Sequence, residues 1–466
     1  MSTFEFLKPD LVMPPTGKTY TQNLSRPIVQ PPSAFLTENP VLARAIPPLV
    51  LLIACLAVYW PIFHHGFLRA WDDQWVVQNP YTELGFVRVN IWDVLTQFYH
   101  GQYSPVNEYY YMLIYLAKGY NPAVFHAASL LLHFSNMLLV YYFVQRVLIQ
   151  SRSFSGSSVQ RISFLTALLF SVHPFLVEAV AWLSASKILV YSFFYLLALQ
   201  AYLSYIQTKQ WRFYFLTILL FIFSFGGKEQ AVTMPCALLL LDYVSSRNLG
   251  GKRVWLEKAP FFALSLLFGY VTFLSQKVNG EGMLSHQAGY PFYQNIVFGF
   301  YSLTEYITKC LFPIRLSFLY PFPNTPGEPM PIRFWIYPVI TLFCVFSLWN
   351  FWKQRWVFFG IAFFLIHIGI TLNFIPTARY SIIADRYVYL ASVGIFFLLA
   401  YFFDKAITLG GRYQKPLLGL CALYMGILGI YGGYRVTAWR DADRLKAEIR
   451  EVLLQRGDYQ QHIDAY

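Results

Sequence analysis

The residues best suited to chemistry are a few charged side chains in a chain with unusually little charge. Asp, Glu, Lys and Arg make up 12% of the 466 residues, about half the share expected of a soluble domain. Asp72 and Asp73 form an acidic pair, while Lys187, Lys228 and Arg386 stand beside apolar runs. The full candidate set is Asp72, Asp73, Lys187, Lys228, Glu229, Arg379, Asp385, Arg386 and Tyr387, with His173 and Glu178 as supporting residues.

The chemistry open to this set follows from its charges. A carboxylate can take the proton of an attacking hydroxyl, and neighbouring cations can bind a phosphate and stabilise it as it leaves. These are the electrostatic requirements of glycosyl transfer from a lipid phosphate, a displacement that needs no cofactor. A divalent cation at the acidic pair stays open, although the lack of further acidic residues in matching places favours a metal-free site.

The elements that must position these residues are membrane helices. Hydrophobic residues make up 57% of the chain, and many apolar stretches approach the ~20 residues that span a bilayer. We therefore predict an all-α polytopic membrane protein with about eleven crossings. The expected spans are Leu49–Phe63, Val124–Leu148, Phe164–Leu183, Leu189–Ile206, Phe213–Phe225, Ala231–Tyr243, Pro260–Gln276, Phe334–Trp352, Phe358–Phe374, Val388–Phe403 and Leu417–Tyr434.

The basic residues indicate the orientation of these spans. The formal charge of +12 comes from Lys and Arg in short connections between apolar runs, which is how membrane topology is encoded. This reading excludes nucleic acid as a partner. Placing the basic connections inside requires that Ile296–Phe312 does not cross, so we expect it to be an in-plane or re-entrant helix. The N-terminus is then inside and the C-terminus outside.

We divide the chain into three parts. Residues 1–45 form a cytoplasmic Pro-rich tail, residues 46–434 a transmembrane domain, and residues 435–466 a short amphipathic C-terminal helix. Residues 64–121 form the first outer loop, which carries the acidic pair and interfacial helices. In this topology all the unusual polar clusters open on one non-cytoplasmic face, and ionisable residues at helix ends usually face a wet cavity. We therefore expect one pocket.

Structural roles remain open for several of these residues. Asp72 and Asp73 are also suited to capping a short loop helix, since Asp is a favoured N-cap residue. Long cations such as Lys187 and Arg379 commonly extend from helix ends toward the membrane interface. Lys228 and Glu229 are also suited to pairing with each other at a tight turn. His173 is better suited to a hydrogen bond between helices than to a metal site.

Seven sequence motifs carry a family resemblance. They read, in order, AWDDQWVVQNP, YNPAVFHAASLLLHFSN, HPFLVEAVAWLSASK, GGKEQAVTMP, LSFLYPFP, ADRYVYLAS and AWRDAD. This order resembles the membrane part of the TMTC-type protein O-mannosyltransferases and their bacterial relatives, within the GT-C superfamily. The resemblance runs from about Trp71 to Asp443. It implies a GT-C-type fold and inverting transfer from a polyprenyl- or dolichyl-phosphate sugar, with the acidic pair at the catalytic centre. On that basis we expect Asp72 to be the base and Asp73 to have a supporting or acceptor-orienting role.

The chain departs from that family pattern at two places. Relatives commonly read YRPL in the first loop, whereas this chain reads Tyr103, Ser104, Pro105 and Val106, so one phosphate-facing Arg is missing or replaced. Relatives also often continue into tetratricopeptide repeats, whereas one amphipathic helix ends this sequence. The identity of the acceptor is therefore open.

The expected function is transfer of a sugar from the lipid phosphate to a hydroxyl of a protein Ser or Thr or of an envelope glycan. The expected location is a bacterial inner membrane or the endoplasmic reticulum, with the site on the periplasmic or lumenal side. A transporter or flippase of lipid-linked sugars is the main alternative, although such proteins have inverted repeats and midplane polar residues, which this sequence lacks. An inactive structural relative is a third reading.

Overall fold

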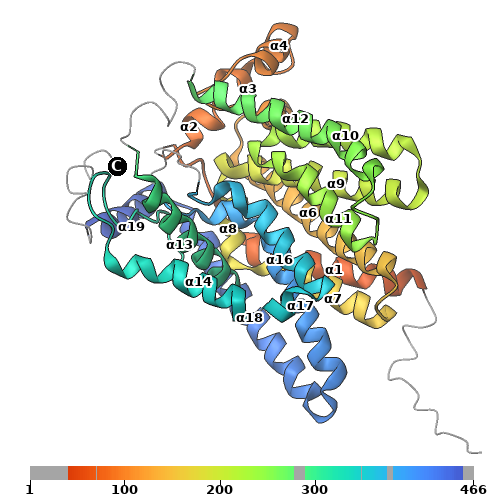
Figure 1. Ribbon diagram of the computed structural model, residues 1–466. Coiled ribbons are helices and arrows are strands. Elements are labelled where there is room, and N and C mark those ends of the chain that lie inside the picture. The colour runs from red at the N-terminus through yellow and green to blue at the C-terminus, as the bar shows by residue number, and fades with distance from the viewer. Residues whose placement is uncertain (1–39, 70, 278–288, 348, 375–380, 455–466) are drawn as a thin grey trace, which may run out of the picture. The chain divides into compact units, whose positions relative to one another are not determined.

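The computed structural model describes residues 40–69, 71–277, 289–347, 349–374 and 381–454 (Figure 1). The regular elements of these ranges are helices, apart from one isolated bridge between Tyr99 and Gln102. The helices are α1 (Pro40–Tyr59), η2 (Trp60–His64), α2 (Asp73–Val76), α3 (Pro80–Leu84), α4 (Arg88–Thr96), α5 (Pro105–Lys118), α6 (Pro122–Ser151), α7 (Gly156–Val172), η3 (Pro174–Leu176), α8 (Val177–Ala181), η4 (Leu183–Ala185), α9 (Ser186–Thr208), α10 (Trp211–Gly227), η5 (Glu229–Thr233), α11 (Met234–Val244), α12 (Lys252–Lys277), α13 (Phe292–Leu311), η7 (Ile332–Trp335), α14 (Ile336–Ser347), α15 (Trp349–Trp352), α16 (Arg355–Ile368), η8 (Gly369–Thr371), η9 (Asp385–Val388), α17 (Ser392–Leu409), η10 (Gly411–Tyr413), α18 (Gln414–Ala438) and α19 (Ala442–Leu454).

Six helices among the described residues are long and apolar enough to cross a membrane. They are Ala45–His64, Pro122–Ser151, Leu183–Thr208, Lys252–Gln276, Ser392–Leu409 and Gly411–Ala438. A seventh span is made if Gly156–Val172 and Pro174–Ala181, bent by 58°, count as one. Shorter apolar helices cover Trp211–Gly227, Ile332–Ser347 and Arg355–Thr371. The all-α polytopic fold is confirmed, while the number of eleven crossings stays a prediction.

The bend after α7 places polar residues inside the helix bundle. His173 has extended backbone dihedrals and precedes Pro174, and a residue before proline is disfavoured in helical conformation. The His173 Nδ1 instead accepts a hydrogen bond from the Phe175 amide at 3.3 Å. The chain then turns through η3 into α8, which carries Glu178 in a fully buried helix.

Close helix packing depends on small residues at the α16–α17 crossing. A Cβ atom on Gly394 would lie 2.3 Å from the Gly360 carbonyl oxygen, and one on Gly360 would lie 2.5 Å from the Leu398 Cγ. Small residues at such crossings allow helix backbones to approach closely in membrane proteins. This contact fixes α17, whose N-terminus follows the predicted Asp385–Tyr387 site segment.

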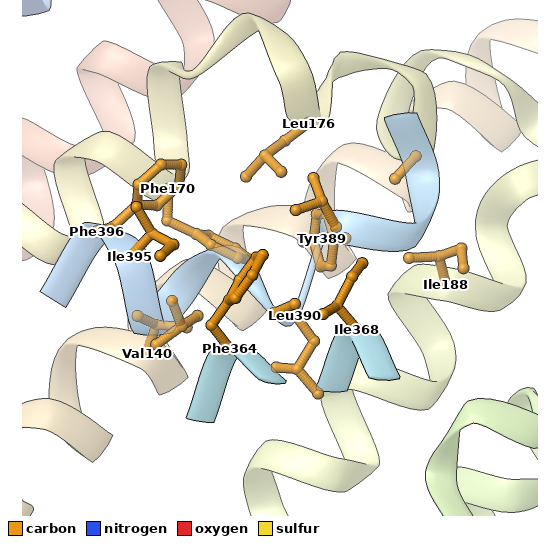
Figure 2. Close-up of a cluster of buried hydrophobic side chains, with 14 of the residues drawn as sticks. Val140, Phe170, Leu176, Ile188, Phe364, Ile368, Tyr389, Leu390, Ile395 and Phe396 are labelled. Atoms are coloured by element: carbon orange, nitrogen blue, oxygen red, sulfur yellow. The ribbon is translucent and has the colours of Figure 1, made fainter. Parts of the chain in front are cut away.

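A layer of apolar side chains lies at the centre of these helices. Figure 2 shows Phe170, Leu176, Ile188, Tyr389 and Leu390 converging from α7, η3, α9 and the segment after η9. All five are 0% exposed. Because Leu176, Ile188 and Tyr389 each lie within three residues of a candidate site residue, the same packing that forms the core also fixes the backbone of the site.

The first loop and the C-terminal segment contain the short helices expected of them. In the first loop, α4 covers Arg88–Thr96, and Val89 and Trp92 of this helix are exposed. The C-terminal α19 buries Leu445, Ile449 and Leu453 on one face, as its helical spacing predicts. The expected cytoplasmic tail at residues 1–45 lies almost entirely outside the described residues. The segment expected to be in-plane or re-entrant is α13, and it is not among the six candidate spans.

Candidate active site

The two members of the acidic pair have different surroundings. Asp73 is 1% exposed and accepts three hydrogen bonds, from the Leu68 amide at 2.8 Å, the Ser184 amide at 3.1 Å and the Ser184 hydroxyl at 2.5 Å. It thereby ties the first loop to η4. Burial raises the pKa of the Asp73 carboxyl, while the Ser184 and Leu68 donors oppose the rise. Its hydrogen-bonding capacity is largely used within the protein.

Asp72 keeps most of its carboxylate available. It occupies the N-cap position of α2, but its side chain makes no capping hydrogen bond, so a capping role does not account for it. Its Oδ1 accepts a hydrogen bond from the Trp75 indole at 3.2 Å. Burial raises the pKa of Asp72, and the Trp75 bond with the charges of Lys187 and Arg386 opposes the rise. A partly buried carboxylate of this kind is suited to act as a general base.

Lys187 lies in the first turn of α9, beside the first loop. Its Nζ donates a hydrogen bond to the Gln102 Oε1 at 2.5 Å. Lys187 and Glu108 also line a small cavity of about 20 Å³ between α2, α3 and α5. Burial raises the pKa of Glu108 to about 7, against the Asn79 hydrogen bond and the Lys187 charge. Lys187 is thus close enough to Asp72 and Glu108 for its charge to oppose the rise in the pKa of both carboxyls.

Two glycines explain how Lys228 reaches the site. A Cβ atom on Gly227 would lie 2.8 Å from the Tyr191 amide nitrogen of α9, and one on Gly226 would lie 2.5 Å from the Val106 Cγ2 of α5. The end of α10 therefore packs directly against both helices. Lys228 follows with extended backbone dihedrals and forms an ion pair with Glu229 at 3.1 Å. The GGKE sequence builds a close-packed turn that presents a buried ammonium group.

Arg386 is the most firmly held cation of the group. Its Nη1 lies 2.5 Å from the Glu178 Oε1, and its backbone amide donates to the Glu178 Oε2 at 3.2 Å. Its guanidinium lies 5.2 Å from the ring centre of Trp182 and 5.0 Å from that of Tyr387. Lys228 lies 5.9 Å from the same Tyr387 ring. The Glu178 charge raises the pKa of Arg386 against burial, so this cation is permanent.

A second buried ion pair, between Asp385 and Arg435, begins at the residue before Arg386. Asp385 accepts a hydrogen bond from the Tyr320 hydroxyl at 2.6 Å and lies 3.7 Å from the Arg435 Nη2. Burial and the nearby Glu178 carboxylate raise the pKa of Asp385 to about 7, against Arg435, Tyr320 and Lys309. Tyr320 and Arg435 were not among the sequence candidates. A charged residue directly after the last apolar run, Leu417–Tyr434, is the signal that points to Arg435.

The structure therefore brings together most of the candidates, places His173 in the core and does not describe Arg379. Around one site stand Asp72, Asp73, Glu178, Lys187, Lys228, Glu229, Asp385, Arg386 and Tyr387. His173 is fully buried and packs against Phe396, with ring centres 4.9 Å apart, so its contacts are with the core. Arg379 lies outside the described residues. Within the described ranges, no group of three or more His, Cys, Asp or Glu side chains is placed to hold a metal ion.

Comparison with known proteins gives sequence relatives. No protein-family model matches the chain. It is 35% identical over 147 residues to the protein O-mannosyl-transferase Tmtc1 of Drosophila melanogaster, and 27% identical over 198 residues to human TMTC1. The mouse TMTC1 protein is 31% identical over 103 residues. The chain is TMTC-like.

The TMTC likeness is partial in extent. The aligned segments cover 31%, 38% and 22% of this chain, but only 16%, 21% and 10% of the three TMTC proteins. Among solved structures, the archaeal oligosaccharyltransferase AglB from Archaeoglobus fulgidus, in complex with an inhibitory peptide and a dolichol-phosphate, is 13% identical with a TM-score of 0.46. That similarity covers 92% of this chain and 60% of AglB.

Proposed function

We propose that this chain is a GT-C-type inverting glycosyltransferase that moves a sugar from a polyprenyl- or dolichyl-phosphate to an acceptor hydroxyl. The observation that carries the proposal is that Lys187 and Arg386 lie close enough to Asp72 for their charges to act on its available carboxylate, while Lys228 lies close to Lys187 and shares the Tyr387 ring with Arg386. Fixed cations of this kind stabilise the charge that develops on a departing phosphate. The likeness to proteins named O-mannosyl-transferases supports the same reaction class.

In the proposed reaction, Asp72 takes the proton from the acceptor hydroxyl as its oxygen attacks the anomeric carbon. The new carbon–oxygen bond forms while the bond between that carbon and the phosphate oxygen breaks. The electron pair leaves with the lipid phosphate, where Arg386 and Lys228 stabilise it. Because the sugar undergoes one displacement, its anomeric configuration inverts. No step requires a cofactor or a metal ion.

The proposal extends to the substrates and the location. The proposed donor enters from the lipid bilayer, and the proposed acceptor is a protein Ser or Thr, with an envelope glycan as the other candidate. The name protein O-mannosyl-transferase carried by the TMTC relatives supports a protein acceptor. We propose that the site opens on the periplasmic or lumenal face of a bacterial inner membrane or the endoplasmic reticulum. This location would let the helix-end cations meet the phosphate of a donor held in the bilayer.

A transfer assay tests this function. The purified chain is reconstituted into vesicles with a radiolabelled polyprenyl-phosphate mannose and a Ser/Thr-rich acceptor peptide. We expect label to appear in the peptide, with inverted configuration by NMR. A matched reaction with the non-hydroxylated peptide, in which Ala replaces Ser and Thr, should remain unlabelled. Movement of labelled lipid across the membrane without any new glycosidic bond would instead identify a flippase and refute the proposal.

A further inference from the structure

A closed ring of contacts connects Arg386 to the last candidate span. Arg386 lies over Trp182 at 5.2 Å, and Trp182 stacks on Trp439 with ring centres 5.6 Å apart and planes at 15°. Trp439 meets Phe318 edge-on at 4.8 Å. Phe318 in turn lies under Arg435 at 4.8 Å, and Arg435 faces Asp385. Because Asp385 immediately precedes Arg386, the ring closes on its starting residue.

Arg435 and Trp439 are the two members of this ring that belong to the last span and its end. They are four residues apart and therefore lie on one face of the helix. Arg435 is 4% exposed and Trp439 is 2% exposed, so neither is available to a substrate. Arg435 also donates from Nη1 to the Leu316 carbonyl oxygen at 3.3 Å, which attaches the segment before Tyr320 to the same helix.

Arg435 balances the negative charge of Asp385 within this ring of contacts. Glu178 holds both the side chain and the backbone amide of Arg386, and Asp385 places a second buried carboxylate next to Glu178. Two neighbouring carboxylates repel each other in a medium of low dielectric constant. Arg435 balances the second carboxylate, with Lys309 and the Tyr320 hydroxyl as its other facing groups. Glu178 is thereby left to hold Arg386.

We infer that Arg435 and Trp439 are positioning residues, which fix the Arg386 guanidinium for the donor phosphate through Asp385 and Trp182. This inference rests on the proposed function. It assigns a role to the last span, which contributes no group to the site itself. Loss of either residue should leave Arg386 present but misplaced, so that donor binding and turnover both weaken.

The first measurement is independent of catalysis. An arginine-specific dicarbonyl reagent labels guanidinium groups, and the Arg386 side chain is only 26% exposed in the intact protein. We expect Arg435→Met and Trp439→Leu to increase the rate of Arg386 labelling several-fold, as read by mass spectrometry of its peptide. Arg435→Lys and Trp439→Phe, which keep the charge and the ring, should label at close to the wild-type rate.

The second measurement is transfer kinetics with a lipid-phosphate mannose donor. We expect Arg435→Met to raise KM for the donor and to lower kcat, so that kcat/KM falls about tenfold. The matched control is Arg161→Met, which removes an Arg–Asp pair at 2.6 Å between α7 and α17, far along both helices from the site. It should lower the melting temperature without changing donor KM or Arg386 labelling.

The outcomes separate this inference from the proposed function. Unchanged Arg386 labelling in both Arg435→Met and Trp439→Leu would overturn the positioning role. Equal changes in Arg161→Met would also overturn it, because they would reflect general destabilisation. Faster Arg386 labelling in a protein whose wild type transfers no sugar would refute the proposed function and leave the positioning role intact.

Discussion

Two charged clusters lie near opposite ends of α9 and differ in how their charges are paired. The site cluster, defined by Asp72, Lys187, Lys228 and Arg386, meets the first turn of that helix. The second, which we call the Asp242 cluster, comprises Tyr202, Asp242, Arg247, Glu257 and Lys258. Lys187 and Tyr202 are fifteen residues apart, which corresponds to about 22 Å along a helix.

The Asp242 cluster is closed on itself. Asp242 pairs with Arg247 at 2.8 Å and with Lys258 at 2.6 Å, and Glu257 pairs with Arg247 at 2.7 Å. Tyr202 donates to Asp242 at 2.8 Å. By contrast, Asp72 forms no ion pair within the described part of the chain, and Lys187 contacts an amide oxygen rather than a carboxylate. Lys228 and Arg386 of the site cluster are ion-paired, with Glu229 and Glu178. The two clusters therefore differ at Asp72 and Lys187, whose charges are not paired within the described residues and remain available to a ligand.

The largest effect expected from this comparison is on catalysis. Asp72→Asn removes the base and keeps the shape of the side chain, so transfer should fall by about 10²–10⁴-fold. Membrane insertion and the melting temperature should stay near wild type, because few contacts hold this carboxylate. The readout is initial rate of transfer per mole of folded protein.

The control for that variant is Asp93→Asn, which changes a carboxylate of the same loop on α4. It should retain full activity. If Asp72→Asn transferred sugar at the wild-type rate, Asp72 would be excluded as the base, and the contrast between the two clusters would lose its functional meaning.

The closed cluster should respond in the opposite way. Lys258→Met leaves Asp242 with one cation fewer in a fully buried position, and breaking a buried pair typically costs about 3–5 kcal/mol. We expect a lower melting temperature and an unchanged kcat and donor KM in the protein that remains folded. Thermal unfolding followed by tryptophan fluorescence measures the first effect, and the transfer assay the second.

A matched change for this variant is Lys405→Met, since Lys405 is exposed and its Nζ makes a 3.4 Å hydrogen bond to Gln354 and lies 4.7 Å from the centre of the Tyr401 ring. It should have little effect on the melting temperature. Loss of turnover in folded Lys258→Met protein would show that the Asp242 cluster contributes to the reaction, contrary to its closed pairing.

The two aspartates of the pair should separate in a third experiment. Asp73→Ala leaves the Leu68 and Ser184 amides without their acceptor in a buried site, at an expected cost of about 1–3 kcal/mol. We expect a moderate loss of stability and a partial loss of activity, because the loop that carries Asp72 loses its tether to η4. Asp73→Asn, which retains one acceptor oxygen, should lie between this variant and the wild type in both properties. A stable, fully inactive Asp73→Asn would make Asp73 the base instead of Asp72.

Much of the fold could be predicted from the sequence because apolar runs of span length have few alternatives in a membrane. The bend at His173 and Pro174 was harder to foresee, since the expected span continued from Phe164 to Leu183. Breaking that helix is what turns Glu178 toward Arg386. The crossing count also depends on short apolar helices such as α10, whose length alone does not decide whether they span.

The residues that make up the site could be predicted from the sequence, but the role of each residue could not. Helix-end charges in an apolar chain are rare, so the residue list could be written from the sequence. The division of labour between Asp72 and Asp73 depends on where Ser184 lies, a contact across 111 residues of sequence. The role of Arg435 depends on its contacts with Asp385, Phe318 and Leu316, which lie far from it in the sequence. No local sequence pattern predicts such contacts.

The smallest predicted effect concerns the acid limb of the pH–rate profile. Asp72 must be ionised to act as a base, so activity is lost as pH falls through its pKa, and burial raises that pKa above its ordinary value. The Trp75 indole stabilises the charged form through its 3.2 Å hydrogen bond. Trp75→Phe removes that donor and should move the acid limb upward by about one pH unit. Trp92→Phe, at an exposed tryptophan of α4, should leave the limb in place. If the acid limb moved downward or stayed in place in Trp75→Phe, the group that titrates in this limb would not be Asp72. Glu108 or Glu229 would then be the carboxylate to test as the base.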